Sequence, residues 1–309
     1  MNKIAYRKFT GINNVDDPVS LIDRSRGNMT IPLVVATNID IHKDQHLSRC
    51  DGYTKVISGI YTSVWSNDFL ILGINNGNLV QIKGDYTITI LMSGVGDYKM
   101  VYETVYDDTG MRVYFTNGMI IGKIKNGVAS LLGATTQEFK SVLPPGDMLK
   151  YFSGRLYLIK DKTIYVSDVL NREVYDRRWG FKQIETTITM FEGLTEGIYV
   201  SDSEGVFWMK KIDEMPEVAA TSSFAFSLID NTPAIPGTAI KLNNIISPSG
   251  ARHRQAVLWT SKNGLCLGGD NGMYERVLDG VYNIPVHYQK GASVFRESGD
   301  LNQYISILK

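Results

Sequence analysis

Few residues in this chain have the types and spacing that catalysis requires. The sequence contains two cysteines, Cys50 and Cys266, and only four histidines, His42, His46, His253 and His287. Nucleophilic catalysis needs a Ser or Cys, a His and an orienting acid brought together, yet no G-x-S-x-G motif occurs. Both cysteines stand beside strand-like residues, so we expect them to be small buried apolar side chains. We therefore expect a protein that is not an enzyme.

One run of residues has the alternation that a metal site on a strand could use. Polar side chains in the run 38–44 alternate with isoleucines and would share one face of a strand: Asn38, Asp40, His42 and Asp44. A half-exposed strand without a metal has the same alternation, so we expect no metal and no other cofactor.

Carboxylates are available for glycoside hydrolysis, but nothing in the sequence pairs them. That reaction needs two carboxylates about 5 to 9.5 Å apart. The candidates are Asp107, Asp108, Asp202 and Glu297. Asp107 and Asp108 belong to an Asp-Asp-Thr-Gly run, which is typical of a turn.

The charge balance argues against functions that depend on a strong electrostatic field. The 309 residues include 32 basic and 32 acidic ones, so the formal net charge is zero. DNA wrapping and binding to anionic membranes both need a basic surface, and we expect neither. No run reaches the roughly 18 apolar residues of a membrane span. We therefore expect a soluble protein with no membrane anchor.

Five Asn-Gly pairs predict hairpins. A type I′ turn needs positive φ at both central residues, which Asn followed by Gly tolerates best. The pairs begin at Asn76, Asn117, Asn126, Asn263 and Asn271, and each lies between apolar or alternating runs. No window of 12 or more residues has a 3.6-residue period, and the best helical candidate is a single turn over residues 136–142. The chain is predicted to be nearly all β.

The strand-like runs recur every 40 to 50 residues or so, which is typical of a β-propeller. Four-stranded units open at Gly59, Met100, Met148, Ile188 and Thr238, and a half unit opens at Gly291. We predict an all-β fold, a β-propeller of about six four-stranded blades. A tandem of β-sandwiches is the alternative.

The half unit at the C-terminus predicts that N-terminal strands complete the last blade, because closure hides two sheet edges. The runs 33–41 and 46–50 could supply those strands. We thus predict a propeller domain over residues 31–309 and an extended N-terminal arm over residues 1–30. The arm is polar and rich in turn residues, and its candidates for assembly contacts are Asn13, Asn14, Asp16, Asp17, Pro18, Arg24 and Arg26.

Two loops carry small basic clusters that could contact a partner. The candidate residues are Arg172, Tyr175, Arg177, Arg178 and Trp179 in the first loop and Arg252 and Arg254 in the second. Glu173 and Asp176 offset the charge of the first loop, so a solvated connection without a partner is the simpler interpretation. If either loop binds, the zero net charge favours an acidic protein surface over nucleic acid.

The order of several short motifs resembles virion structural proteins of tailed bacteriophages, of the β-propeller tail-hub or head-to-tail stabilisation type. The motifs are Gly-Ile-Asn-Asn-Val-Asp-Asp-Pro (11–18), Leu-Ser-Arg-Cys-Asp-Gly-Tyr-Thr-Lys-Val (47–56), Val-Tyr-Phe-Thr-Asn-Gly (113–118), Gly-Arg-Leu-Tyr-Leu (154–158) and Ile-Tyr-Val-Ser-Asp (164–168). They are spread over most of the chain, and none of them carries catalytic residues.

The resemblance implies a non-enzymatic structural component of a phage tail or head-tail connector. Its implied partners are copies of itself in a ring, the portal or adaptor, and distal tail proteins, with DNA at most passing through a central channel. The implied location is the virion, assembled in the cytoplasm of the host bacterium.

Two other functions remain open at this stage. A host-surface or glycan-binding propeller would need exposed aromatic anchors, for which Tyr175, Trp179 and Tyr282 are the candidates. A metal-dependent propeller hydrolase would need a site that we cannot assemble from the sequence.

Overall fold

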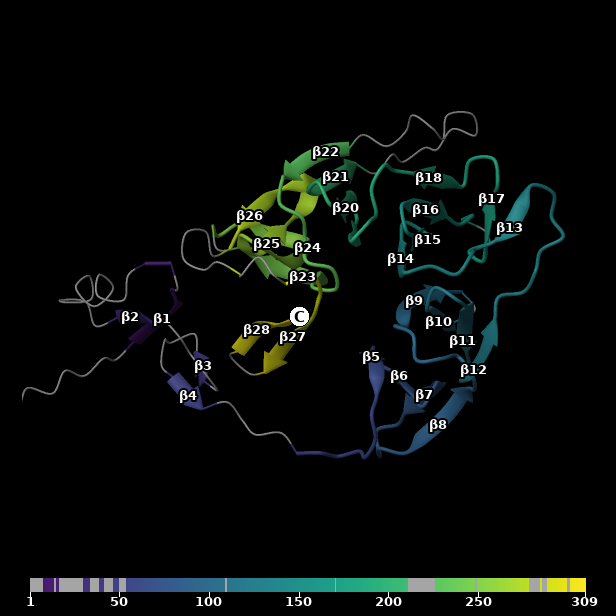
Figure 1. Ribbon diagram of the computed structural model, residues 1–309, viewed down its shortest axis with the longest axis horizontal. Helices are drawn as coiled ribbons and strands as arrows, with labels where there is room; N and C mark the ends of the chain where they lie inside the picture. The colour runs from purple at the N-terminus through teal and green to yellow at the C-terminus, as the bar shows by residue number, and fades with distance from the viewer. Residues whose placement is uncertain are drawn as a thin grey trace, which may run out of the picture. The chain divides into compact units, whose positions relative to one another are not determined.

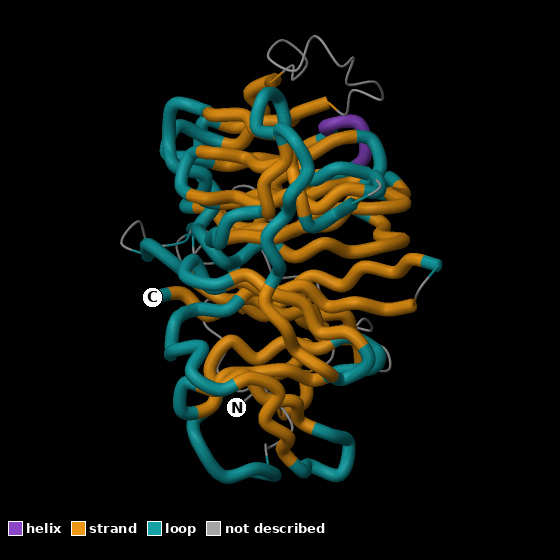
Figure 2. The backbone as a smooth tube through the Cα atoms, turned by 90° about the vertical axis from the view of Figure 1, so that its right-hand side faces the viewer, coloured by secondary structure: helices purple, strands orange, loops and turns teal. Residues whose placement is uncertain are grey.

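The computed structural model describes most of the chain from residue 54 onward and short segments before it. The described residues are 8–13, 15–16, 30–33, 39–41, 47–49, 54–108, 110–169, 171–210, 226–247, 249–277, 284, 288–298 and 301–309. Strands dominate them, and their one helical element is the 3₁₀ turn η1 (Asp270–Gly272), drawn in purple in Figure 2. None of the described helical structure is long and apolar enough to cross a membrane.

Five four-stranded sheets follow one another along the chain, and most of their strands are labelled in Figure 1. The first is β5 (Thr62–Ser66), β6 (Ile71–Asn75), β7 (Asn78–Ile82) and β8 (Ile88–Met92). The second is β9 (Val101–Asp107), β10 (Gly110–Thr116), β11 (Ile121–Lys125) and β12 (Val128–Leu131). The third is β14 (Met148–Phe152), β15 (Arg155–Lys160), β16 (Thr163–Val166) and β18 (Phe181–Gln183).

The remaining strands complete the series. The fourth sheet is β19 (Met190–Leu194), β20 (Gly197–Ser201), β21 (Val206–Lys210) and β22 (Phe226–Asp230). The fifth is β23 (Ile240–Ile246), β24 (Arg252–Ser261), β25 (Gly264–Gly268) and β26 (Tyr274–Arg276). Four strand pairs stand apart: β27 (Gly291–Ser298) with β28 (Leu301–Leu308), β13 (Lys140–Val142) with β17 (Val174–Asp176), β3 (Ile39–Ile41) with β4 (Leu47–Arg49), and, in parallel, β1 (Lys8–Ile12) with β2 (Thr30–Leu33).

The repeat predicted from the sequence is confirmed as a series of antiparallel four-stranded sheets in an all-β chain. The first strands of the successive units begin at residues 62, 101, 148, 190, 240 and 291, each within three residues of its predicted start.

The chain divides into two compact units. A central unit comprises residues 54–198 and 210–225, and a terminal unit comprises residues 1–53, 199–209 and 226–309. The packing described below lies within one unit or the other.

Two Asn-Gly pairs form the predicted type I′ hairpins. Asn76 and Gly77 have φ of 49° and 71°, and Asn126 and Gly127 have 51° and 75°. They close the ladders β6–β7 and β11–β12, respectively. Both turns therefore arise from the local need for positive φ at two consecutive residues.

The other Asn-Gly pairs differ from a two-residue hairpin. Thr116 pairs with Ile121, and the four residues between them form a loop. In this loop Asn117 Oδ1 accepts hydrogen bonds from the amides of Met119 and Ile120. Gly264 is the first residue of β25, with φ of 103°, so its turn is centred on residues 262–263. Asn271 and Gly272 both have positive φ but lie in η1.

The helical turn expected over residues 136–142 is wrong. Residues 137–139 form a turn in which Phe139 has φ of 59°, and Lys140–Val142 is strand β13. Pairing of Lys140 with Asp176 and of Val142 with Val174 fixes this segment as a strand. Because that partner is more than 30 residues away in sequence, the local pattern could not reveal it.

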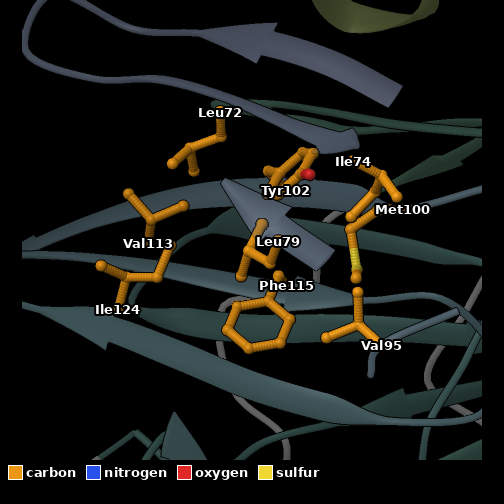
Figure 3. Packing of buried hydrophobic residues seen from close by; sticks show 9 residues of the cluster. All are labelled: Leu72, Ile74, Leu79, Val95, Met100, Tyr102, Val113, Phe115 and Ile124. Atoms are coloured by element: carbon orange, nitrogen blue, oxygen red, sulfur yellow. The ribbon is translucent and has the colours of Figure 1, made fainter. Parts of the chain in front are cut away.

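In the central unit, consecutive sheets pack face to face. The core between the first and second sheets contains Leu72, Ile74, Leu79, Val95, Met100, Tyr102, Val113, Phe115 and Ile124 (Figure 3). The core between the second and third contains Val105, Tyr114, Ile121, Leu143, Leu149, Leu156 and Leu158. The second sheet thus buries apolar side chains on both faces.

The terminal unit repeats this arrangement. Tyr199 of β20 packs against Trp259 of β24, with ring centroids 5.6 Å apart. The fifth sheet in turn packs through Leu242, Leu258 and Leu267 against Phe295 and Tyr304 of the β27–β28 hairpin. The hairpin is also anchored by polar contacts, since the Tyr304 hydroxyl donates to the Thr238 carbonyl oxygen at 2.7 Å.

We expect Gly122→Ala to destabilise the chain, because an aromatic ring and a carbonyl group occupy the space next to Gly122. A Cβ there would lie 2.4 Å from Cζ of buried Phe115 and 2.5 Å from the Ser130 carbonyl oxygen. Overpacking of this kind costs about 1–3 kcal/mol of unfolding free energy. Urea unfolding measures the change. Gly133→Ala is the matched control, because a Cβ at Gly133 meets nothing within 4 Å, and an equal loss in both variants would contradict the packing described here.

Candidate functional site

The predicted interaction loop, residues 171–179, is tied to the second sheet by ion pairs. Arg172 Nη1 lies 3.1 Å from Asp107 Oδ2, and Glu173 Oε1 lies 2.5 Å from Lys123 Nζ. Asp107 ends β9 and Lys123 lies on β11. The guanidinium of Arg172 also lies over the ring of Tyr151, 5.6 Å from its centroid. Arg172 therefore holds the loop against its own chain.

Arg178 is fixed by one carboxylate and two aromatic rings. Its Nε and Nη2 lie 3.0 and 2.9 Å from the two carboxylate oxygens of Asp176. Its guanidinium carbon lies 3.7 Å from the ring centroid of Trp179 and 4.3 Å from that of Phe139. Because stacking and a two-pronged ion pair both restrict a guanidinium, Arg178 is held in one orientation at the surface.

The carboxylate that holds Arg178 is itself buried and strongly stabilised as an anion. Hydrogen bonds from Arg178 hold the pKa of Asp176 well below its usual range. Burial of the carboxylate works against this shift, and a hydrogen bond and the charge of Lys140 add to it. Lys140 Nζ lies 3.1 Å from Asp176 and 2.9 Å from Asp168. The loop is thus a rigid, ion-paired turn.

The remaining residues of this predicted site have different surroundings. Tyr175 packs edge-on against Tyr165, with ring centroids 5.2 Å apart. Arg177 is exposed, and its amide donates to the Phe139 carbonyl oxygen. Trp179 carries Arg178 on its ring. Two of the three glycan-binding anchors, Tyr175 and Trp179, therefore already have partners within the chain, while Tyr282 lies outside the described residues.

The second predicted loop belongs to the terminal unit. Arg252 and Arg254 are exposed at the start of β24, where Arg252 pairs with Ile246 in the ladder. The amide of Arg254 donates to Asp270 Oδ2 at 3.1 Å. Their side chains are at the surface.

Two of the predicted arm residues are described, and both help to close a turn. Asn13 is buried, its side-chain oxygen accepts from the amides of Val15 and Asp16, and its Nδ2 donates to Asp16 Oδ2. The amide of Asn13 donates to the Leu33 carbonyl oxygen, next to the β1–β2 pairing. The other predicted arm residues, Asn14, Asp17, Pro18, Arg24 and Arg26, lie outside the described residues.

Most residues considered for catalysis or metal binding have structural partners where they are described. Asp108 is exposed, and the buried Nε2 of His253 has no hydrogen-bond partner among the described residues. Asp107 pairs with Arg112 and Arg172. Asp202 accepts from the amides of Glu204 and Gly205 in a turn. Asp40 contacts Gln303 and Arg296. Cys266 is fully buried, and burial raises the pKa of its thiol.

Several of these candidates cannot be placed. Asn38, His42, Asp44, His46, Cys50 and His287 lie outside the described residues, as does the side chain of Glu297. In the part of the chain that the structure does describe, no group of three or more His, Cys, Asp or Glu side chains could hold a metal ion.

Sequence reasoning missed a charged contact between first strands of neighbouring sheets. Lys150 on β14 lies 2.5 Å from Glu192 Oε1 on β19. Burial opposes the charge of Lys150, but attraction by Glu192 and by Glu103 on β9 outweighs it and raises the pKa of Lys150. Each of the three residues is third in its strand. That shared position, within strands that are otherwise apolar in β14 and β19, is the signal that could have revealed the contact.

Sequence reasoning also missed an apolar second face on the first sheet. The ladder registers place Val64, Ile71, Val80, Ile82, Ile88 and Ile90 on the face opposite Leu72 and Leu79. Val80 and Ile82 in the middle are buried, whereas Val64 and Ile90 are each 58% exposed. This second face therefore offers apolar surface to a further neighbour.

The β27–β28 hairpin has an open apolar face of the same kind. Phe295 and Tyr304 pair across the hairpin on the side that packs on the fifth sheet. The opposite side carries Ala292, Val294, Ile305 and Ile307, and Ile307 is 73% exposed.

Comparisons with known proteins identify the fold and no family. No protein-family model matches this chain, and no curated protein matches it. Among solved structures, BBS1N in complex with ARL6DN is 11% identical over 87% of this chain and 83% of that one, with a TM-score of 0.50.

Two further solved structures are less similar. The extracellular domain of a hybrid two-component system from B. thetaiotaomicron is 15% identical over 80% of this chain, with a TM-score of 0.47. This chain covers only 30% of that one. A catalytically inactive virginiamycin B lyase from Staphylococcus aureus with quinupristin is 12% identical over 87% of this chain and 84% of that one, with a TM-score of 0.42. These structures are β-propellers, and the likeness to BBS1N supports that fold alone.

We expect Asp176→Asn to remove an acid-sensitive part of the stability. The pKa of Asp176 is lowered by folding, so its contribution is fully present above the unfolded value of about 3.9 and is lost as the pH falls below it. At neutral pH the substitution should cost about 1.5–3 kcal/mol of unfolding free energy, the usual value for a hydrogen bond to a charged group. The difference from wild type should shrink below about pH 4.

Urea unfolding between neutral and acidic pH tests this expectation. Asp108→Asn is the control, because Asp108 is exposed, and that variant should follow the wild-type profile within about 0.5 kcal/mol. A difference between Asp176→Asn and wild type that stays constant down to acidic pH would show that the carboxylate charge is not what stabilises the turn.

Proposed function

We propose that this chain is a non-enzymatic structural component of a tailed-bacteriophage virion, which binds partner proteins in the tail or at the head-to-tail junction. The observation that carries the proposal is that the candidate reactive side chains make structural contacts, while an arginine and a tryptophan lie fixed at the surface. Asp107, Asp202 and Cys266 are engaged in ion pairs, turns or the core, whereas Arg178 and Trp179 form a rigid turn at the surface.

A rigid turn suits protein recognition. Binding immobilises side chains at a cost of about 0.5–1.5 kcal/mol each, and a side chain that is already fixed loses less. Arginine and tryptophan are also the types enriched among the residues that dominate binding energy at protein interfaces. The partners in this proposal are copies of the chain in a ring, the portal or adaptor, and distal tail proteins. The resemblance of several short motifs to those of phage tail-hub proteins supports that choice.

We further propose that the sheets close into a propeller of about six blades. In this arrangement the last blade combines β27–β28 with the N-terminal strands β3–β4. A contact within the terminal unit supports it, because Gln303 Nε2 on β28 donates to Asp40 Oδ1 on β3 at 2.8 Å. Arg296 Nη1 on β27 also lies 3.7 Å from Asp40 Oδ2.

In a closed propeller every sheet has a neighbour on both faces, which would account for two apolar faces that are open within the described units. One is the second face of the first sheet, and the other is the Ala292–Val294–Ile305–Ile307 side of the hairpin. Burying such side chains is worth about 25 cal/mol per Å². The proposal therefore explains why strands at both ends of the series are apolar on the side away from their described neighbour.

Immunogold electron microscopy on purified particles tests the virion role. With antibody to this chain, gold should appear at the tail or head-tail junction, and the chain should occur in the particle proteome. A chain lacking residues 1–30 should fold but fail to join particles, since the arm is assigned to assembly. Intact particles that lack both the label and the chain would end the proposal, and normal incorporation of the truncated chain would end the role of the arm.

A pair of matched substitutions tests closure. Ile307→Thr should cost about 1.5 kcal/mol of unfolding free energy if the propeller closes over Ile307. The control is Ile246→Thr, on a strand where Ile246 is 62% exposed, and it should stay within about 0.5 kcal/mol of wild type. Chemical denaturation gives both values. Equal, near-zero effects would contradict closure over this face.

A further inference from the structure

The edge strand of the first sheet, β8, has a composition that favours pairing with a strand of another chain. From Thr87 to Met92 it contains only Thr, Ile, Leu and Met, with no charged residue. Thr87 and Thr89 are exposed, and Ile88 and Ile90 are 42% and 58% exposed. Edge strands that remain unpaired usually carry charges, prolines or bulges that prevent pairing with another chain.

Three of the four corresponding outer strands, β12, β18 and β26, differ from β8, and the fourth, β22, ends in the charged residue Asp230. Strand β18 carries Lys182 at its centre, and β26 carries Glu275 and Arg276. Strand β12 is uncharged, but it contains Ala129 and Ser130, which lack the strand preference of Ile and Thr. Among these outer strands, β8 thus combines high strand propensity with an uncharged edge.

The backbone groups of Ile88 and Ile90 face the open side of the sheet. The amide of Lys83 donates to the Thr87 carbonyl oxygen at 2.9 Å, so Thr87 directs its carbonyl group toward the β7 side. Antiparallel ladders use alternate residues of a strand, and Ile88 and Ile90 pair in register with Ile82 and Val80. The amide and carbonyl groups of these two isoleucines therefore point away from β7.

We infer that β8 pairs antiparallel with β8 of a second copy of this chain, about a two-fold axis at Thr89. In this register Ile88 exchanges main-chain hydrogen bonds with Ile90 of the other copy, and Thr89 lies opposite Thr89. Thr87 then lies opposite Leu91, and Tyr86 opposite Met92. A two-fold contact requires such a self-complementary patch.

The charge pattern favours a second copy over a charged partner. No like charges oppose each other in this register, since Asp85 lies opposite Ser93 and Lys83 opposite Val95. Strand β8 has no charged side chain that would favour binding of an acidic or a basic peptide. The pairing also continues the open apolar face, because Ile71, Ile88 and Ile90 share one side of the sheet.

The contact is small, so the dimer should be weak. A pair of short strands buries less than the roughly 1,600 Å² of a standard interface. The inference uses residues of the central unit alone and does not rest on the virion role. It predicts an association that depends on protein concentration in the isolated 309-residue chain.

Sedimentation velocity on the 309-residue chain over a range of concentrations tests the inference. The wild type should show a growing dimer fraction. Thr89→Lys and Thr89→Glu place like charges opposite each other and should each weaken the dimer about fivefold. An equimolar mixture of the two variants should restore wild-type association, because opposite charges then face each other.

Ser130→Lys is the matched control, an added lysine at an exposed residue of the outer strand β12, and it should associate like the wild type. Circular dichroism should show unchanged folding in all variants. A wild type that stays monomeric at every concentration, an oligomer insensitive to the charge at Thr89, or no recovery in the mixture would each overturn the inference. Loss of association in Ser130→Lys would overturn it as well.

Discussion

A sheet whose two faces are both apolar needs a neighbour on each of them. In the first sheet, Leu72 and Leu79 lie on one face and Val80 and Ile82 on the other. Exposed apolar area costs about 25 cal/mol per Å², so a single such sheet is unstable in water. The packing of the second sheet against the first and the third satisfies this need, whereas the second face of the first sheet keeps Val64 and Ile90 exposed.

Charged contacts fix how neighbouring sheets and their loops are aligned. Arg172 with Asp107 and Lys123 with Glu173 join the 171–179 loop to the second sheet, and Lys150 with Glu192 joins two first strands. Removing both charges from water costs free energy that their attraction only partly returns. The main effect of these ion pairs is therefore to restrict how the two segments that each pair joins can be positioned.

The fold was predictable because its signals are local. Asn76-Gly77 and Asn126-Gly127 need positive φ wherever they occur, and strand runs recur at the spacing of the sheets. The side-chain contacts of the predicted loop were harder to predict from the sequence, because they depend on the register between distant segments. Nothing near Arg172 in sequence indicates Asp107, which lies 65 residues away. The turn at Phe139 was missed for the same reason, since β13 exists through its pairing with β17.

The central claim, that the series of sheets closes on itself, is most directly tested by a distance between its ends. Spin labels at Asp68→Cys and Lys290→Cys, both exposed positions, would report on it by double electron–electron resonance. A Cys50→Ser background leaves only Cys266, which is fully buried. Closure predicts one narrow distance distribution. A broad distribution in the folded chain would contradict closure and leave the apolar faces to other partners.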